Sequence, residues 1–307
     1  MPEGPEVSII REGLSKLLEG SIITKFEITE KSRYHKKHPD GYNNFNEKLP
    51  LIVKEIASKG KLIYFEFVDS SNNSIFLLNT LGLSGGWFHT PKKNSGIKIT
   101  YMSPANSSTT NTQPQETEIW FDDQRHFATF KFIDNISDIQ DALRKLGPDM
   151  MFGIAKKHGQ FSNNNNINPE ITPELFINRL RKYGTKNNKN ITELLMEQKV
   201  ISGIGNYLKC EGLYNSRISP WAKINNLTDE NLMVLYNSLR ANITRSYKVG
   251  GASIRHYSDI NDVKGEFEYD MQVYGKKNCP NGSTIKHEDT PDKRTTYWCP
   301  SIQIIGV

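Results

Sequence analysis

The feature that most constrains this fold is a change of hydrophobic pattern near residue 135. Before that point, short runs rich in β-branched and aromatic residues are separated by polar turns, which is typical of strands. After it, apolar residues recur at helical spacing in five longer segments. Since strand and helix patterns occupy separate parts of the chain instead of alternating, the sequence predicts an α+β protein.

Expected elements can be placed along the chain. A first helix is expected at about residues 4–20, because Val7, Ile10 and Leu14 recur at helical spacing and Pro5 suits a first turn. Strands are expected at residues 21–29, 51–57, 61–68, 74–79, 96–102 and 126–133. Helices are expected at residues 136–146, 173–183, 191–199, 206–216 and 229–249. Several short strands at such intervals predict a sandwich or a barrel, and we favour the sandwich.

The same pattern predicts four parts. Residues 1–135 form a helix-plus-β-sandwich domain, and residues 136–169 form a linker that contains one helix. Residues 170–265 form a helical domain, and residues 266–307 return to short strands and turns. Two Asn-rich tracts (163–166 and 186–190) and a Ser/Thr/Asn stretch (106–112) are expected to be surface loops or linkers.

Composition narrows the class of protein. The chain has 307 residues, of which 36% are hydrophobic and 10% aromatic, so it can build a core and is not wholly disordered. An excess of 39 basic over 34 acidic residues permits a polyanionic partner without identifying one. No apolar run is long enough to span a bilayer, the acidic start is unlike a signal peptide, and three cysteines cannot form a disulfide framework. We expect a soluble, intracellular protein.

The first residues offer an unusual chemistry. If Met1 is removed, Pro2 becomes a secondary amine close in sequence to Glu3 and Glu6. An α-amino group has a pKa of about 7.7–8.0, so part of it is a neutral nucleophile near neutral pH. Such an amine can attack C1′ of a sugar, displace a base and form an iminium, while a carboxylic acid handles the protons. On the residues alone, Pro2 is better explained as a residue that starts a helix.

Five ordered segments resemble the formamidopyrimidine-DNA glycosylase / endonuclease VIII family. They are residues 1–7 (Met-Pro-Glu-Gly-Pro-Glu-Val), 58–61 (Ser-Lys-Gly-Lys), 81–85 (Leu-Gly-Leu-Ser-Gly), 123–127 (Asp-Gln-Arg-His-Phe) and 198–207 (Gln-Lys-Val-Ile-Ser-Gly-Ile-Gly-Asn-Tyr). With residues 250–275 and the tail, the resemblance covers essentially the whole chain. It implies a catalytic β-sandwich domain, a helix-two-turn-helix domain and a β-hairpin finger.

The resemblance implies catalytic roles at matching positions. Pro2 corresponds to the Schiff-base nucleophile, Glu3 to the general acid that opens the sugar, and Glu6 to a supporting carboxylate. Lys61 corresponds to the lysine that contacts the phosphate beside the lesion and assists catalysis. Without the resemblance, Lys61 reads as a solvated charge at the start of a strand.

A base must leave the stack before C1′ can be reached, and the vacated space must be filled. Leu83, Arg125 and Phe127 match the three family positions that fill it. The resemblance implies that Arg125 bonds the orphaned partner base and that Phe127 wedges the stack, while Leu83 replaces the Met of many members. From the residues alone, Phe127 and Leu83 are also compatible with a hydrophobic core.

Two further phosphate contacts are expected in the helical part. The Gly-Ile-Gly turn before Asn206 allows close backbone approach, and the following helix presents free amides. The resemblance makes Asn206 a ligand of the backbone beside the lesion. Lys186 is expected to add a phosphate contact or to be a solvated loop charge.

The tail departs from the family pattern. Many members end in a zinc finger with two Cys-x-x-Cys pairs, but here only Cys279 and Cys299 remain. A tetrahedral zinc would have to recruit residues such as His287 or Asp289. We therefore expect a zincless hairpin and no cofactor, with Arg294 at the position of the DNA-binding arginine and of a late proton-transfer group.

The resemblance implies a bifunctional DNA glycosylase and AP lyase that acts on double-stranded DNA, with β- and then δ-elimination, in base excision repair. The segment 250–275 favours oxidised purines, namely 8-oxoguanine and formamidopyrimidines; Leu83 and the zincless finger favour oxidised pyrimidines instead. A non-catalytic DNA-binding paralogue, a monofunctional glycosylase and a zinc-finger regulator are the rival readings. A monomer is expected, located in the nucleus or another DNA-containing compartment if the source is eukaryotic or viral.

Overall fold

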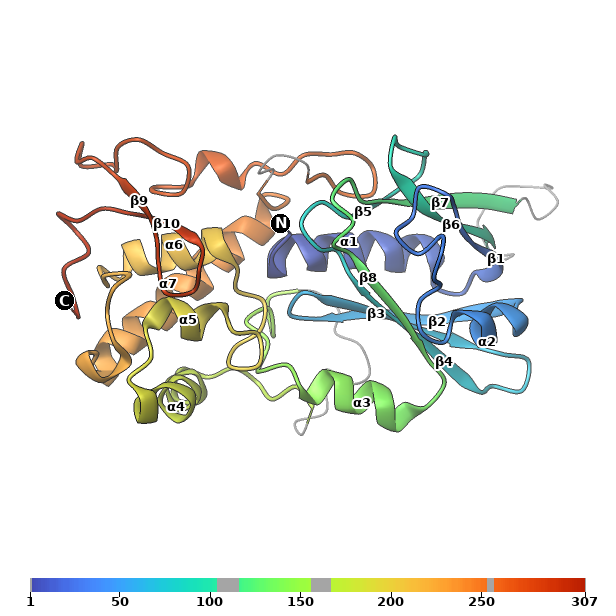
Figure 1. Ribbon diagram of the computed structural model, residues 1–307, viewed down its shortest axis with the longest axis horizontal. Coiled ribbons are helices and arrows are strands. Elements are labelled where there is room, and N and C mark those ends of the chain that lie inside the picture. The colour runs from blue at the N-terminus through green and yellow to red at the C-terminus, as the bar shows by residue number, and fades with distance from the viewer. Residues whose placement is uncertain (1, 104–115, 156–166, 253–256, 307) are drawn as a thin grey trace.

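The computed structural model describes residues 2–103, 116–155, 167–252 and 257–306. It confirms an α+β fold with a strand-rich first part and a helical second part (Figure 1). The expected loops at 106–112 and 163–166, and residues Ser253, Ile254 and Arg255 of the segment 250–275, lie outside the described residues. No helix in these ranges is long and apolar enough to cross a membrane.

Eight strands of the first part form one hydrogen-bonded ladder that folds into two layers. The strands are β1 (Ile22–Ile28), β2 (Leu51–Lys59), β3 (Leu62–Val68), β4 (Ser74–Thr80), β5 (Gly86–Phe88), β6 (Ser95–Met102), β7 (Glu116–Asp122) and β8 (Thr129–Ile133). Their order is β5-β7-β6-β1-β2-β3-β4-β8. β1 meets β2 only at Ile22 and Ile23, so the ladder bends at this junction. Phe65 on β3 then packs against Trp87 on β5, with ring centroids 6.1 Å apart, across the interior.

Helix α1 (Gly4–Leu18) starts at the residue expected from the sequence. Pro5 lies in its first turn, and Val7, Ile10 and Leu14 are buried in the core that both layers share. α1 packs against β2 and β3 and also reaches α7 (Asp229–Lys248) of the second part. The first residues of the chain therefore lie between the two parts (Figure 1).

The second part is a bundle with its own apolar core. It contains α4 (Pro173–Gly184), the short η1 (Thr185–Asn187), α5 (Ile191–Met196), α6 (Asn206–Asn215), η2 (Ile224–Asn226) and α7. Thr172, Asn190 and Thr228 cap α4, α5 and α7, as their sequence positions suggest. Helix α3 (Ile136–Arg144) precedes the bundle and packs on β8.

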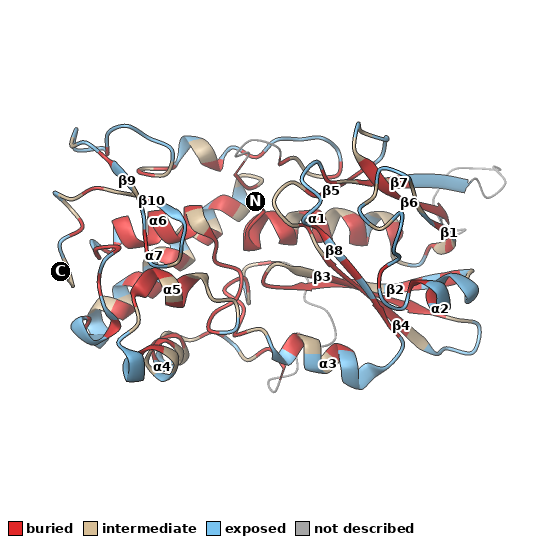
Figure 2. Ribbon diagram, in the orientation of Figure 1, coloured by how far each residue is buried: buried red, intermediate tan, exposed pale blue. Residues whose placement is uncertain are grey.

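The tail folds back over the bundle. After η3 (Phe267–Tyr269), β9 (Lys286–Asp289) and β10 (Thr295–Trp298) form an antiparallel hairpin that contacts α6. Residues 207–214 of α6 are all buried, which Figure 2 shows as a red helix beneath the hairpin. We call residues 266–307 the finger and residues 290–294 the finger turn.

Some expected boundaries and elements were wrong. The helix expected at 191–199 ends at Met196, and the strand expected at 126–133 begins only at Thr129. Helix α2 (Tyr42–Glu47) and strands β5 and β7 were not expected. α2 has six residues and β5 has three, too few for a periodic pattern to emerge.

Candidate active site

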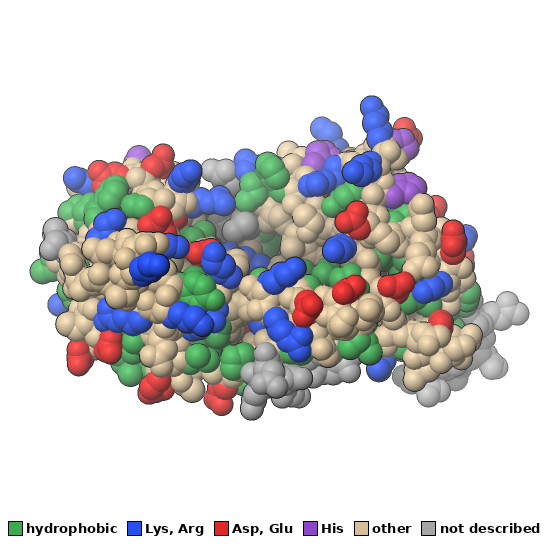
Figure 3. All heavy atoms as spheres, turned by 60° about the horizontal axis from the view of Figure 1, so that its bottom comes forward, with side chains coloured by type: hydrophobic (Ala, Val, Ile, Leu, Met, Phe, Trp, Pro, Cys, Tyr) green, Lys and Arg blue, Asp and Glu red, His purple; other side chains and the backbone are tan. Residues whose placement is uncertain are grey.

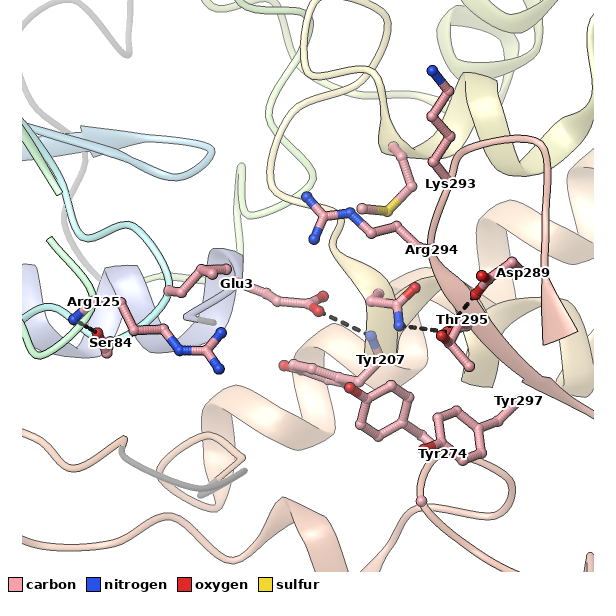
Figure 4. Close-up of a pocket in the computed structure, with 14 residues that line it drawn as sticks. Glu3, Ser84, Arg125, Tyr207, Tyr274, Asp289, Lys293, Arg294, Thr295 and Tyr297 are labelled. Carbon is pink, nitrogen blue, oxygen red and sulfur yellow. Dashed lines mark hydrogen bonds between the residues drawn. The ribbon is translucent and has the colours of Figure 1, made fainter. Parts of the chain in front are cut away.

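A cleft of about 690 Å³ opens where the N-terminus, the loops of the sandwich, α6 and the finger meet. Glu3 lies in it, with Leu83, Ser84 and Arg125 from the sandwich loops and Arg294 from the finger turn. In Figure 4, Arg125 and Arg294 lie on different sides of Glu3. Figure 3 shows Lys and Arg side chains gathered across the middle of one face of the molecule, where its two parts meet.

Glu3 binds the start of α6. Its carboxylate accepts the backbone N–H groups of Gly205 (2.7 Å) and Tyr207 (2.9 Å), and its side chain is buried. Free amides and the positive end of the dipole make a helix start a natural anion site. A Cβ on Gly205 would lie 2.2 Å from Cδ of Glu3, so only glycine leaves room for this carboxylate.

Burial dominates the electrostatics of Glu3. It raises the pKa of this carboxyl from 4.5 to about 7, in part against the opposing charge of Lys61 and with a further upward push from Glu6. A group with such a pKa both holds and releases a proton near neutral pH. Glu3 is therefore suited to general acid–base work in the cleft.

Glu6 supports this end of the chain. One oxygen accepts the N–H of Glu3 (2.8 Å), and the other accepts the Tyr207 hydroxyl (2.9 Å) and the N–H of Ala252 (2.8 Å). Its buried side chain does not line the cleft. The structure thus places Glu6 as a brace that joins α1, α6 and the segment after α7.

Pro2 and Lys61 flank the same carboxylates. Pro2 is buried directly before Glu3, and the N–H of Gly4 bonds to the carbonyl of Gly203 (2.9 Å). Lys61 follows Gly60, whose N–H bonds to Asp149 (2.9 Å). Burial lowers the pKa of Lys61, while the charge of Glu3 raises it. The structure therefore brings Pro2, Glu3 and Lys61 together.

The void-filling positions lie on two adjoining loops. Leu83 and Arg125 line the cleft, and Phe127 is 58% exposed, which excludes the core interpretation of Phe127. Asp123 holds the loops together, because one oxygen accepts the Ser84 hydroxyl (2.7 Å) and the other accepts the N–H of Ala128 (2.8 Å). Sequence reasoning missed these roles of Ser84 and Asp123, although both lie inside the recognised motifs.

Of the remaining predicted site residues, two line the cleft and one does not. Asn206 and Arg294 line the cleft, and the side-chain amide of Asn206 donates to the carbonyl of Thr295 in the finger (2.9 Å). Lys186 is exposed on η1 and is not among the residues that line the cleft. Tyr207, Tyr274 and Tyr297, which sequence reasoning did not select, form one wall (Figure 4).

The finger offers a poor zinc site. Cys279 and Cys299 are buried with their sulfur atoms 2.9 Å apart, whereas two thiolates on one tetrahedral zinc stand about 3.8 Å apart. Asp289 accepts the Thr295 hydroxyl (2.8 Å), and the His287 ring packs on Tyr297. Within the described ranges, no three His, Cys, Asp or Glu side chains cluster as metal ligands. The residues present do not fit the metal.

Two family models match most of the chain. The formamidopyrimidine-DNA glycosylase N-terminal domain matches residues 1–130, and the formamidopyrimidine-DNA glycosylase H2TH domain matches residues 167–258. The formamidopyrimidine-DNA glycosylases of Ligilactobacillus salivarius and Mycoplasma mobile are 26% and 27% identical, each covering 99% of both chains.

Solved structures show the same fold. A Lactococcus lactis FPG mutant in complex with Fapy-dG-containing DNA has a TM-score of 0.77 at 24% identity, covering 99% of this chain and all of that one. MutM in complex with carbocyclic 8-oxo-G-containing DNA has a TM-score of 0.76 at 24% identity, with the same coverage. Fold, cleft and family models together define a DNA glycosylase with a helix-two-turn-helix domain. More narrowly, the chain belongs to the formamidopyrimidine-DNA glycosylase family.

Proposed function

We propose that this protein is a bifunctional DNA glycosylase and AP lyase that removes oxidised bases from double-stranded DNA in base excision repair. The observation that carries the proposal is the buried Glu3, held at the start of α6 with a pKa of about 7, next to Pro2 and in a cleft shared with Arg125 and Arg294. The DNA bound to related structures supports the same partner.

The chemistry follows from these groups. After loss of Met1, the neutral amine of Pro2 attacks C1′ of the damaged nucleotide. The bond from C1′ to the base breaks, and Glu3 donates its proton to the ring oxygen as the sugar opens. The resulting iminium acidifies the 2′ proton, and its removal expels the 3′ phosphate (β-elimination). A second elimination expels the 5′ phosphate, for which Arg294 at the finger turn assists proton transfer.

The sandwich loops keep the lesion out of the stack. We propose that Leu83, Arg125 and Phe127 enter the space left by the extruded nucleotide. An aromatic side chain that is 58% exposed beside a cleft gains apolar contact when it is inserted between bases. Arg125 is exposed on the same loop and donates to the unpaired partner base. Lys61 and Asn206 contact phosphates on either side. Lys186, exposed and not among the residues that line the cleft, adds a phosphate contact farther along the duplex.

For the lesion, we propose oxidised purines, 8-oxoguanine and formamidopyrimidines first. The names of the relatives and the family-like segment 250–275 support this choice, and Tyr274 and Gly275 of that segment line the cleft. Oxidised pyrimidines are the alternative. A cleavage panel of duplexes with 8-oxoguanine, formamidopyrimidine, thymine glycol or an abasic site ranks the substrates; fastest cleavage of thymine glycol would reverse the assignment.

We further propose that the finger is zincless, that no cofactor is required and that the protein is a monomer in a DNA-containing compartment of the cell. The donor set around Cys279 and Cys299 supports the first part. Metal analysis of purified protein measures it directly, and one equivalent of zinc per chain would overturn it.

Borohydride trapping tests the mechanism. Protein lacking Met1, shown by mass spectrometry, should form a covalent adduct with an abasic-site duplex in the presence of borohydride. Protein in which an N-terminal extension blocks Pro2 should bind the duplex without forming the adduct. Trapping and strand incision by the blocked protein would refute the Pro2 assignment, and duplex binding without any adduct by the processed protein would indicate a non-catalytic DNA-binding paralogue.

A further inference from the structure

The finger turn is attached to α6 by polar groups that are unusual inside a helical core. Helix α6 is buried at every residue from 207 to 214, yet it carries Lys209 and Glu211 there. Charged side chains are rarely fully buried unless a partner compensates them. Both side chains bond to residues of the finger. The residues that they bond show which parts of the finger α6 holds in place.

Lys209 holds the finger turn. Its ammonium lies 2.6 Å from a carboxylate oxygen of Asp292, and the two side chains are only 0% and 2% exposed. The other oxygen of Asp292 accepts the Thr290 hydroxyl, which also meets the hydroxyl of Thr296 (2.6 Å). The ion pair thus closes the turn from within, two residues before Arg294.

Glu211 holds the first part of the finger, before its hairpin. Its two oxygens accept three consecutive backbone N–H groups, those of Gln272 (2.9 Å), Val273 (3.0 Å) and Tyr274 (2.8 Å). Burial raises the pKa of this carboxyl, and the three N–H groups oppose the rise. One turn of α6 therefore fixes the finger at two places by charge-assisted bonds.

These attachments hold the hairpin at its turn, whereas a metal would hold it at Cys279 and Cys299. A four-cysteine site crosslinks the two ends of a small hairpin, but here only two thiols remain and their spacing does not fit zinc. A hairpin of two four-residue strands is marginal without a further clamp. The buried ion pair supplies that clamp from the neighbouring helix.

We propose that Lys209 and Asp292 are positioning residues, whose buried ion pair replaces the finger metal and holds Arg294 over the cleft. The inference rests on the proposed glycosylase function, since Arg294 acts on the DNA and the pair acts only through Arg294. A buried pair is a weak source of net stability but a strong constraint on geometry, because either charge left alone is costly.

A double-mutant cycle between Lys209→Met and Arg294→Ala tests the proposal. Loss of the pair should slow the second elimination in a single turnover, the step that Arg294 assists, about tenfold to a hundredfold, as misplacement of a catalytic group does. On the Arg294→Ala background, Lys209→Met should slow the second elimination no further, because the group that it positions is already absent. Equal effects of Lys209→Met on both backgrounds would overturn the inference.

Three controls separate positioning from stability. Lys209→Arg should restore most of the rate, and a chelator should leave the wild-type rate unchanged. Lys54→Met removes the ion-pair partner of the buried Glu66 (2.9 Å) in the sandwich, so it should lower the melting temperature without changing the rate. If Lys209→Met does not fold, the neutral pair Lys209→Met with Asp292→Asn takes its place in the cycle, since removal of both charges spares the desolvation cost.

Borohydride trapping distinguishes the two proposals. Wild-type protein without any adduct would refute the proposed function itself. Wild-type protein that forms the adduct, together with a folded Lys209→Met variant that completes the second elimination at the wild-type rate, would refute only the positioning role.

Discussion

Glu3 occupies an environment that changes what its carboxyl does near neutral pH. With a pKa of about 7 it loses its proton over the range in which the Pro2 amine, at about 7.7–8.0, becomes nucleophilic. The product of acid and free amine therefore peaks between about pH 7 and 8 and falls about tenfold per unit on the alkaline side. A single-turnover pH profile measures this.

The Glu3→Gln variant tests whether Glu3 causes the fall in rate on the alkaline side of that profile. Glutamine cannot lose a proton, so the variant should be slower at every pH but level above pH 8. An unchanged alkaline fall in the variant would show that another group causes it.

Gly205 tests whether the Glu3 carboxylate needs its seat on α6. In Gly205→Ala, the new Cβ would lie 2.2 Å from Cδ of Glu3, so the carboxylate must move off the helix start. We expect a loss of about 1–3 kcal/mol in unfolding free energy and at least a tenfold slower excision. Denaturant unfolding and single-turnover assays measure both. Gly13→Ala is the control, because its Cβ would meet the Ile260 side chain at 3.0 Å and not Glu3, so any change in stability there should leave the excision rate unchanged.

At the scale of elements, Lys59 joins β2 to the linker. Its buried ammonium donates to the carbonyls of Leu143 (2.9 Å) and Leu146 (3.1 Å) at the end of α3, and to that of Ile167 (2.5 Å). Lys59→Met leaves these carbonyls without their donor and should lower the unfolding free energy by about 2–5 kcal/mol. Urea unfolding at pH 7 measures the loss; an unchanged midpoint would contradict this role.

The same lysine predicts a pH dependence. Burial lowers the pKa of Lys59 from 10.5 to about 8, so the folded state releases the proton before the unfolded state does. The buried charge of Lys59 therefore lowers the free energy of unfolding below about pH 8. As the pH rises from 8 to 10.5, the unfolding free energy of the wild type should increase relative to that of Lys59→Met.

Helices and strands that are long enough to show a periodic pattern were predictable from the sequence. Contacts between segments that lie far apart in the sequence were not. Periodicity located α1, α7 and most strands, and the motifs located Glu3, Arg125 and Arg294. Lys209 escaped notice because its partner Asp292 lies 83 residues away and no local pattern links a helix lysine to a hairpin turn. Phe127 shows the same limit, since the residues alone were also compatible with a core position and only the structure shows that its ring is exposed.

At the scale of the whole molecule, the cleft collects positive charge from both parts of the chain. Arg125 comes from the sandwich, and Lys293 and Arg294 come from the finger, while the charge of Lys61 acts on Glu3 from beside the cleft. Duplex affinity should therefore fall linearly on a log–log plot against salt, because each bound phosphate releases counterions. Arg294→Ala should reduce that slope by about 1, as measured by fluorescence anisotropy of an undamaged duplex, whereas Lys54→Ala on the sandwich should not change it.

The bond between Glu3 and Gly205 has a consequence for biosynthesis. It joins residues that are 202 positions apart in the sequence. Glu3 leaves the ribosome first, and the start of α6 that binds it is synthesised only with the helical part. Until then, the amine of Pro2 has neither the buried carboxyl of Glu3 beside it nor the cleft around it. On the proposed mechanism, a truncated sandwich domain should therefore show no incision activity, and the complete polypeptide should.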